Sequence, residues 1–156
     1  MKRILVAGIG NIFQSDDGFG VAVAQRLERD GLPEGARVVD FGIRGVHLAY
    51  DLLEPPDLLV IVDTTSRSGP PGTLYLIDPE VEPEVFTGVS PDAHAMDPCA
   101  VLLAVKQMGG ALPRTRIVGC EPVDLEEGMG LSTPVEQAIE PAIAMIRRLI
   151  DSEVSS

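Results

Sequence analysis

Two carboxylates and one histidine stand where their side chains could do chemistry together. Asp17 follows the first apolar run of the chain, Asp63 closes a later and more apolar run, and His94 precedes a predicted helix. Two carboxylates and an imidazole suit a borderline divalent metal such as zinc, nickel or manganese, with coordination positions left open. A carboxylate at such a site can also act as a general base on a water molecule. We therefore take Asp17, Asp63 and His94 as the candidate site.

Each candidate also has a structural interpretation. Asp16 and Asp17 precede a predicted helix, where a carboxylate can cap free backbone N–H groups and interact favourably with the helix dipole. We expect this pair to divide, with Asp16 serving the local fold and Asp17 the site. Asp63 could be an ordinary polar strand end, and His94 could be a surface or structural histidine of a loop.

The elements that must position these residues alternate between strands and helices. Apolar runs of strand length occupy residues 3–7, 36–40, 58–62, 73–77 and 114–118. Helices are predicted over residues 19–31, 46–53 and 97–108 and from residue 133 onward, with an irregular loop over 80–91. This order predicts an α/β fold, a three-layer α/β/α domain with an open, mostly parallel twisted sheet. Ligands in such folds bind outside the carboxyl ends of the strands, where the candidate residues fall.

The carboxyl-terminal segment carries clear helix signals. Thr133 and Glu136 are spaced as in a capping box, with Pro134 at the first helical position. Pro141 should kink this helix, because it removes one hydrogen bond and clashes with the preceding turn. We assign residues 1–151 to a single domain and residues 152–156 to a flexible tail.

Composition argues against several classes of function. The 156 residues include 12 Lys+Arg and 24 Asp+Glu, a formal net charge of −12. A chain this acidic lacks the cationic surface needed to bind nucleic acid or an anionic membrane. No apolar run reaches ~18 residues, so we expect no membrane-spanning helix. We also expect no signal peptide, because the first apolar run has the length of a strand. Cys99 and Cys120 are too few for a disulfide framework, so we expect buried thiols and a reducing cytoplasm.

One glycine motif points to a different function. Gly8 and Gly10 after the first strand, with Asp40 at the end of the second, resemble part of a dinucleotide-binding fingerprint. Phe13 stands where the third glycine should be, and the adjacent aspartates would put two negative charges beside a pyrophosphate. The glycines fit better with a tight turn and a close backbone approach, and a nucleotide-binding module stays the weaker alternative.

Motifs along essentially the whole chain share one family pattern. They are Gly8-x-Gly10-Asn11 with Ser15-Asp16-Asp17-Gly18-x-Gly20, Asp63 closing its apolar run, Ser90 to His94 before a helix, and Gly119-Cys120-Glu121-Pro122 through Gly128-Met129-Gly130-Leu131-Ser132. In this order and spacing the chain resembles the hydrogenase maturation proteases. These endopeptidases trim the carboxyl-terminal extension from the large-subunit precursor of nickel–iron hydrogenases.

The resemblance implies a metal-contacting set of Asp17, Asp63 and His94. It also implies that the enzyme acts only on a nickel-loaded precursor, recognising that nickel instead of keeping a metal of its own. Cadmium or zinc could occupy the same site in vitro. Asp17 or Asp63 would then be the general base on a water, with the ion or a backbone N–H of the glycine-rich loop stabilising the oxyanion.

Further residues are expected at the substrate or in the loops that frame it. These are Gly10, Asn11, Gly42 and Gly45. Many family members have Glu at the position of Asp17. Many also have Asp-Gly-Gly-Thr where residues 40–45 read Asp-Phe-Gly-Ile-Arg-Gly, which puts a hydroxyl contact to substrate in doubt. A chaperone that binds the precursor without cutting it stays open as an alternative, and we expect the protein to act as a monomer.

Overall fold

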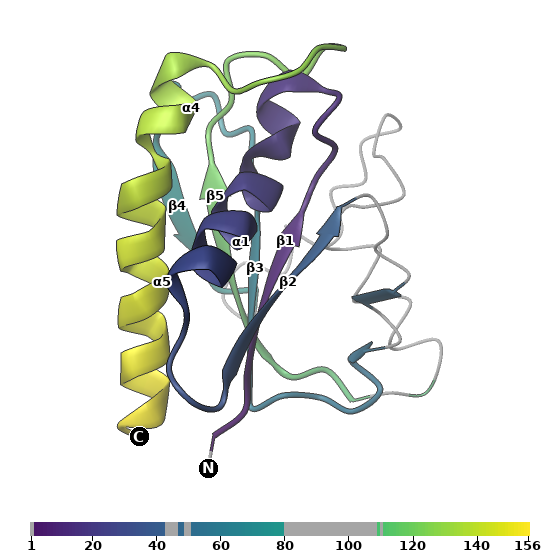
Figure 1. Ribbon diagram of the computed structural model, residues 1–156, viewed down its shortest axis with the longest axis vertical. Coiled ribbons are helices and arrows are strands. Elements are labelled where there is room, and N and C mark those ends of the chain that lie inside the picture. The colour runs from purple at the N-terminus through teal and green to yellow at the C-terminus, as the bar shows by residue number, and fades with distance from the viewer. Residues whose placement is uncertain (1, 43–46, 49–50, 80–108, 110) are drawn as a thin grey trace.

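Five strands form one sheet in the order β2-β1-β3-β5-β4 (Figure 1). The computed structural model describes residues 2–42, 47, 48, 51–79, 109 and 111–156. The strands are β1 (Ile4–Ile9), β2 (Ala36–Gly42), β3 (Leu58–Thr64), β4 (Leu74–Ile77) and β5 (Arg114–Cys120). All neighbours pair in parallel except β4, which runs antiparallel to β5 at one edge. The predicted open, mostly parallel α/β sheet is confirmed.

The central strands are apolar because both faces of the sheet are covered. All six residues of β1 are buried, as are the first five of β3. Val6 pairs with Val38 on one side and with Val60 on the other, so the three strands end close together. The predicted first strand is too short, since β1 continues through Gly8 to Ile9.

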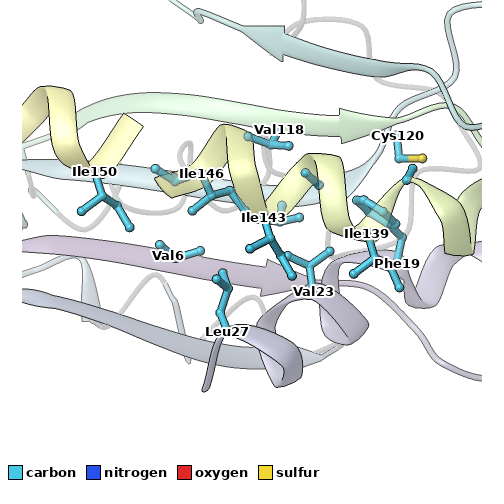
Figure 2. Close-up of a cluster of buried hydrophobic side chains, with 14 of the residues drawn as sticks. Val6, Phe19, Val23, Leu27, Val118, Cys120, Ile139, Ile143, Ile146 and Ile150 are labelled. Carbon is cyan, nitrogen blue, oxygen red and sulfur yellow. The ribbon is translucent and has the colours of Figure 1, made fainter. Parts of the chain in front are cut away.

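Two helices cover one face of this sheet. They are α1 (Phe19–Asp30), which ends at Gly31 as predicted, and α5 (Ile139–Val154). Figure 2 shows their apolar side chains meeting those of the strands, with Val23 and Leu27 of α1 opposite Ile143 of α5. A helical face with apolar residues every three or four positions buries one continuous stripe in this way.

A second apolar cluster lies on the opposite face. Leu5, Ile61 and Ile117 of the sheet pack there with Leu48 and Leu52. Of the helix predicted over 46–53, the described residues 47, 48 and 51 are helical. The loop predicted over 80–91 and the helix predicted over 97–108 lie outside the described residues.

The carboxyl-terminal helix is divided in two. The short α4 (Thr133–Gln137) and α5 meet at Ala138, whose N–H bonds to the carbonyl of Val135. Pro141 has no N–H to offer to the carbonyl of Gln137, which accounts for a break at this point in place of a kink. The predicted capping box is wrong: Ser132, not Thr133, is the N-cap residue, and no side chain caps the helix.

The flexible tail predicted over 152–156 is also wrong in most of its length. The 16-residue α5 continues to Val154. Glu153 is buried and its carboxylate pairs with Arg114 at 2.9 Å and with Lys2 at 3.8 Å. These contacts hold the last turn of α5 against the amino-terminal ends of β1 and β5. In the part of the chain that the structure describes, no helix is long and apolar enough to cross a membrane.

Candidate active site

The candidate site lies at the carboxyl ends of β1 and β3, which are adjacent and parallel. Gly8 of β1 pairs with Val62 of β3, so the segments that follow them leave the sheet side by side. After β1 come a short loop and the 3-10 helix η1 (Ser15–Gly18), while Asp63 and Thr64 complete β3. Asp17 and Asp63 therefore belong to neighbouring segments at the same edge, as the strand-end argument predicts.

Gly20 sets the height of η1 above the sheet. A Cβ atom at Gly20 would collide with the carbonyl oxygens of Ile9 and Val62. Only glycine lets the first turn of α1 rest directly on the ends of both strands. Because Asp17 lies three residues earlier, this close approach carries its side chain to the end of β3.

Asp17 is held by donors from two segments. Its Oδ2 accepts the backbone N–H of Asn11 at 2.9 Å, and its Oδ1 accepts the hydroxyl of Thr64 at 3.3 Å. Gly10 has φ +149°, and a Cβ there would collide with the backbone carbonyl of Asp17. The glycine thus allows the loop to fold tightly against η1. The carboxylate is half-buried, so it is oriented by the protein and still accessible.

Asp63 shares one of these partners. Its Oδ1 accepts the backbone N–H of Thr64 at 2.8 Å, while the Thr64 hydroxyl points to Asp17. Thr64 therefore contacts both carboxylates and sets their spacing. The sequence interpretation missed Thr64, although a hydroxyl residue directly after a strand-end aspartate is a signal that could have identified it.

Asp16 has a different environment from its neighbour. Its side chain is completely buried and accepts the N–H groups of Val123, Asp124 and Ser132 and the Ser132 hydroxyl, at 2.7 to 3.0 Å. Burial alone would raise the pKa of Asp16, but these four hydrogen bonds outweigh it and hold the pKa below its ordinary value. Asp16 thus serves the fold, by binding a loop more than 100 residues away. The expected capping of the following helix is wrong, since no side chain caps η1 or α1.

Glu121, directly after β5, is a second buried carboxylate that the sequence interpretation missed. Its Oε1 accepts the N–H groups of Arg67 and Gly69 and the hydroxyl of Tyr75, at 2.8 to 3.0 Å. Burial works to raise the pKa of Glu121, and these hydrogen bonds lower it below its ordinary value. The carboxylate fastens the loop that follows Asp63.

A groove of about 310 Å³ opens beside Asp17, between the loop after β1 and the end of β2. It is lined by Gly10, Asn11, Ile12, Phe13, Val21, Gln25, Asp40, Phe41 and Gly42. Three residues expected at substrate or in its framing loops, Gly10, Asn11 and Gly42, thus share one groove. The Oδ1 of Asn11 accepts the N–H of Phe13 at 2.9 Å, which holds the loop in shape.

The glycine turn is not built for a phosphate. A dinucleotide-binding turn directs its free N–H groups at the pyrophosphate. Here the N–H of Asn11 donates to the Asp17 carboxylate and the N–H of Gly10 donates to the carbonyl of Gly42. The turn instead fixes a carboxylate above the sheet.

Two of the sequence candidates cannot be placed. His94 and Gly45 lie outside the described residues, and so does Cys99. Within residues 2–42, 47, 48, 51–79, 109 and 111–156, no group of three or more His, Cys, Asp and Glu side chains could hold a metal ion. Cys120 is buried, as expected, and burial with the nearby Asp16 and Glu121 raises the pKa of its thiol to about 12. Such a thiol is no nucleophile at neutral pH.

Comparisons with known proteins agree on one family. Residues 21–149 match the family model described as hydrogenase maturation protease. The hydrogenase 2 maturation protease of Escherichia coli K12 is 34% identical over 146 residues, which is 92% of this chain and 88% of that protein. The hydrogenase expression/formation protein HupD of Bradyrhizobium diazoefficiens is 36% identical, over 91% of this chain and 74% of that protein. The structure of the hydrogenase maturating endopeptidase HybD from E. coli superimposes with a TM-score of 0.83 at 32% identity, covering 97% of this chain and 93% of that one.

Proposed function

The chain belongs to the hydrogenase maturation protease family, and we propose that it is the endopeptidase that removes the carboxyl-terminal extension from a nickel-loaded [NiFe] hydrogenase large-subunit precursor. The single observation that carries the assignment of the site is the shared contact of Asp17 and Asp63 with Thr64 at adjacent strand ends. Asp17, Asp63 and His94 then contact the nickel that the precursor brings, and no metal stays bound after release.

The two carboxylates supply the base for hydrolysis. One of them takes a proton from the attacking water as the water oxygen bonds to the carbonyl carbon of the scissile peptide. The carboxylate then gives this proton to the peptide nitrogen as the C–N bond breaks, so that the amine leaves and the carboxylate is regenerated. Asp17 is suited to this work because its two hydrogen bonds fix its orientation while it stays half-buried.

The glycine-rich loop is poorly placed to stabilise the oxyanion. The N–H groups of Gly10, Asn11 and Phe13 already donate to Gly42, Asp17 and Asn11 respectively. Breaking one of them would leave a buried or half-buried acceptor without its donor. We therefore assign stabilisation of the oxyanion to the substrate's nickel, acting as a Lewis acid.

One chain is enough for this reaction. Both carboxylates, and the groove lined by the loop that contacts Asp17, come from a single copy, so we propose a monomeric enzyme. The free, buried Cys120 fits a reducing compartment, and we place the reaction in the cytoplasm.

The test compares precursor with and without nickel. Wild-type protein should shorten the nickel-loaded precursor by the mass of its extension and leave nickel-free precursor intact, as measured by mass spectrometry. Asp63→Asn and His94→Ala should abolish the mass change. Asp151→Asn, which alters an exposed aspartate on α5, should not. Cleavage of nickel-free precursor would contradict nickel recognition, and full activity of Asp63→Asn would contradict the site.

A further inference from the structure

Exposed apolar side chains gather on two loops beside the candidate site. One loop joins β1 to η1, and the other joins β5 to α4. The structure describes nine large apolar side chains that are exposed, and five of them lie on these loops. We call these five the docking edge: Ile12, Phe13, Val123, Leu125 and Met129. Met129 is 73% exposed and Phe13 is 58% exposed. Clustered exposed apolar residues of this kind mark interaction surfaces.

The two loops are joined into one rigid unit. The N–H of Gly128 donates to the carbonyl of Phe13 at 2.8 Å, and the N–H of Ser15 donates to the carbonyl of Gly128 at 2.9 Å. The Ser15 hydroxyl adds a bond to the carbonyl of Glu126, and Asp16 supplies the four side-chain hydrogen bonds described above. A surface fixed before binding loses little conformational freedom when a partner arrives.

The same hydrogen bonds couple the docking edge to the site. Asp16, which binds the 123–132 segment, is the immediate neighbour of Asp17 in η1. Phe13 also lines the groove that opens beside Asp17. A partner bound to the docking edge is therefore held next to Asp17, one of the two proposed catalytic carboxylates.

Charge on this surface indicates the chemistry of its partner. Asp124, Glu126 and Glu127 are exposed among the apolar residues, and residues 121–132 contain no Lys or Arg. A complementary surface is apolar at its centre and bordered by Lys or Arg. A second copy of this chain would instead place the same three acids close to their own equivalents, in a protein that already carries a net charge of −12.

We propose that the docking edge binds the hydrogenase precursor on the folded surface that surrounds its carboxyl-terminal extension. This inference rests on the proposed function and adds where the precursor is held. The partner surface is apolar with a basic rim, and the contact presents the extension to Asp17 and Asp63.

Charge placed on the docking edge should weaken precursor binding. In Leu125→Asp/Met129→Asp, the Kd for nickel-loaded precursor should rise about tenfold or more, because two apolar contacts are lost and negative charge is added. Processing should show a matching rise in KM, with a much smaller change in kcat. Glu126→Lys/Glu127→Lys should also raise the Kd, because the new lysines would repel the Lys and Arg residues at the rim of the precursor's surface.

Leu112→Asp is the matched control. Leu112 is 42% exposed, as is Leu125, but it precedes β5 at the opposite edge of the sheet. Its Kd should equal that of wild type, and thermal unfolding of all variants should confirm intact folds. An unchanged Kd in Leu125→Asp/Met129→Asp would overturn the docking edge, as would a wild-type dimer in sedimentation that this variant loses. Wild type that binds the precursor but never shortens it would instead overturn the proposed function.

Discussion

Four of the carboxylates at the carboxyl edge of the sheet divide into two regions. Asp16 and Glu121 are buried, accept three or four hydrogen bonds each, and have lowered pKa values. Asp17 and Asp63 are half-buried and share Thr64 as a partner. Asp16 and Glu121 use their oxygens to bind loops, whereas Asp17 and Asp63 stay accessible. Acidity at a strand end therefore says little about function until the partners of each oxygen are known.

The largest expected loss of activity follows removal of an accessible carboxylate. Asp17→Ala should lower processing by about 10²- to 10⁴-fold, the range for loss of a positioned general base. Asp17→Glu should retain more activity, because it keeps the carboxylate and moves it by about one methylene. Both should unfold near the wild-type temperature. Equal activity losses in the two variants, measured by precursor mass change, would argue that Asp17 only supports the loop.

Next in size is the removal of a buried carboxylate. Asp16→Ala should destabilise the fold by about 3 kcal/mol, since it leaves the donors of Val123, Asp124 and Ser132 without an acceptor. Chemical denaturation would measure the loss. Activity at saturating precursor and low temperature should fall far less than in Asp17→Ala. A stability equal to wild type would remove the distinction between the two neighbours.

Acid below about pH 4 should weaken the fold through the two buried carboxylates. The folded-state pKa values of Asp16 and Glu121 lie below their unfolded values of about 4. Their stabilising contribution is thus complete above about pH 4 to 5 and is lost as pH falls through the lower folded values. The free energy of unfolding should decline over that range. In Asp16→Asn the free energy of unfolding should decline less steeply with falling pH. An unchanged dependence on pH would contradict the lowered pKa of Asp16.

The smallest expected effect concerns the link between the two accessible carboxylates. Thr64→Val keeps the shape of the side chain and removes the hydroxyl that contacts Asp17. The lost hydrogen bond is worth about 1 kcal/mol, so kcat should fall only about fivefold, with stability nearly unchanged. Thr65→Val, one position along, serves as the control. A loss as large as that of Asp17→Ala would make Thr64 a direct participant in the reaction.

Local patterns predicted most of the sheet and both helices that cover its first face. The apolar runs of β1, β2, β3, β4 and β5, and the amphipathic spacing of α1, required no knowledge of their neighbours. The helix break at Ala138, the anchoring of Glu153 and the role of Glu121 could not be predicted in this way. Each of these depends on a partner far away in the sequence or on the geometry of a single turn.

The sequence by itself determined the fold class, the family and the short list of strand-end carboxylates. The sequence also led us to expect Asp16 to serve the fold and Asp17 the site, but only the tertiary structure shows the contacts by which they divide. In a 3-10 helix, side chains of consecutive residues point about 120° apart. From η1, one carboxylate therefore turns toward the 123–132 segment and the other toward the end of β3. No spacing in the chain indicates which does which, because the answer depends on where two distant segments come to lie.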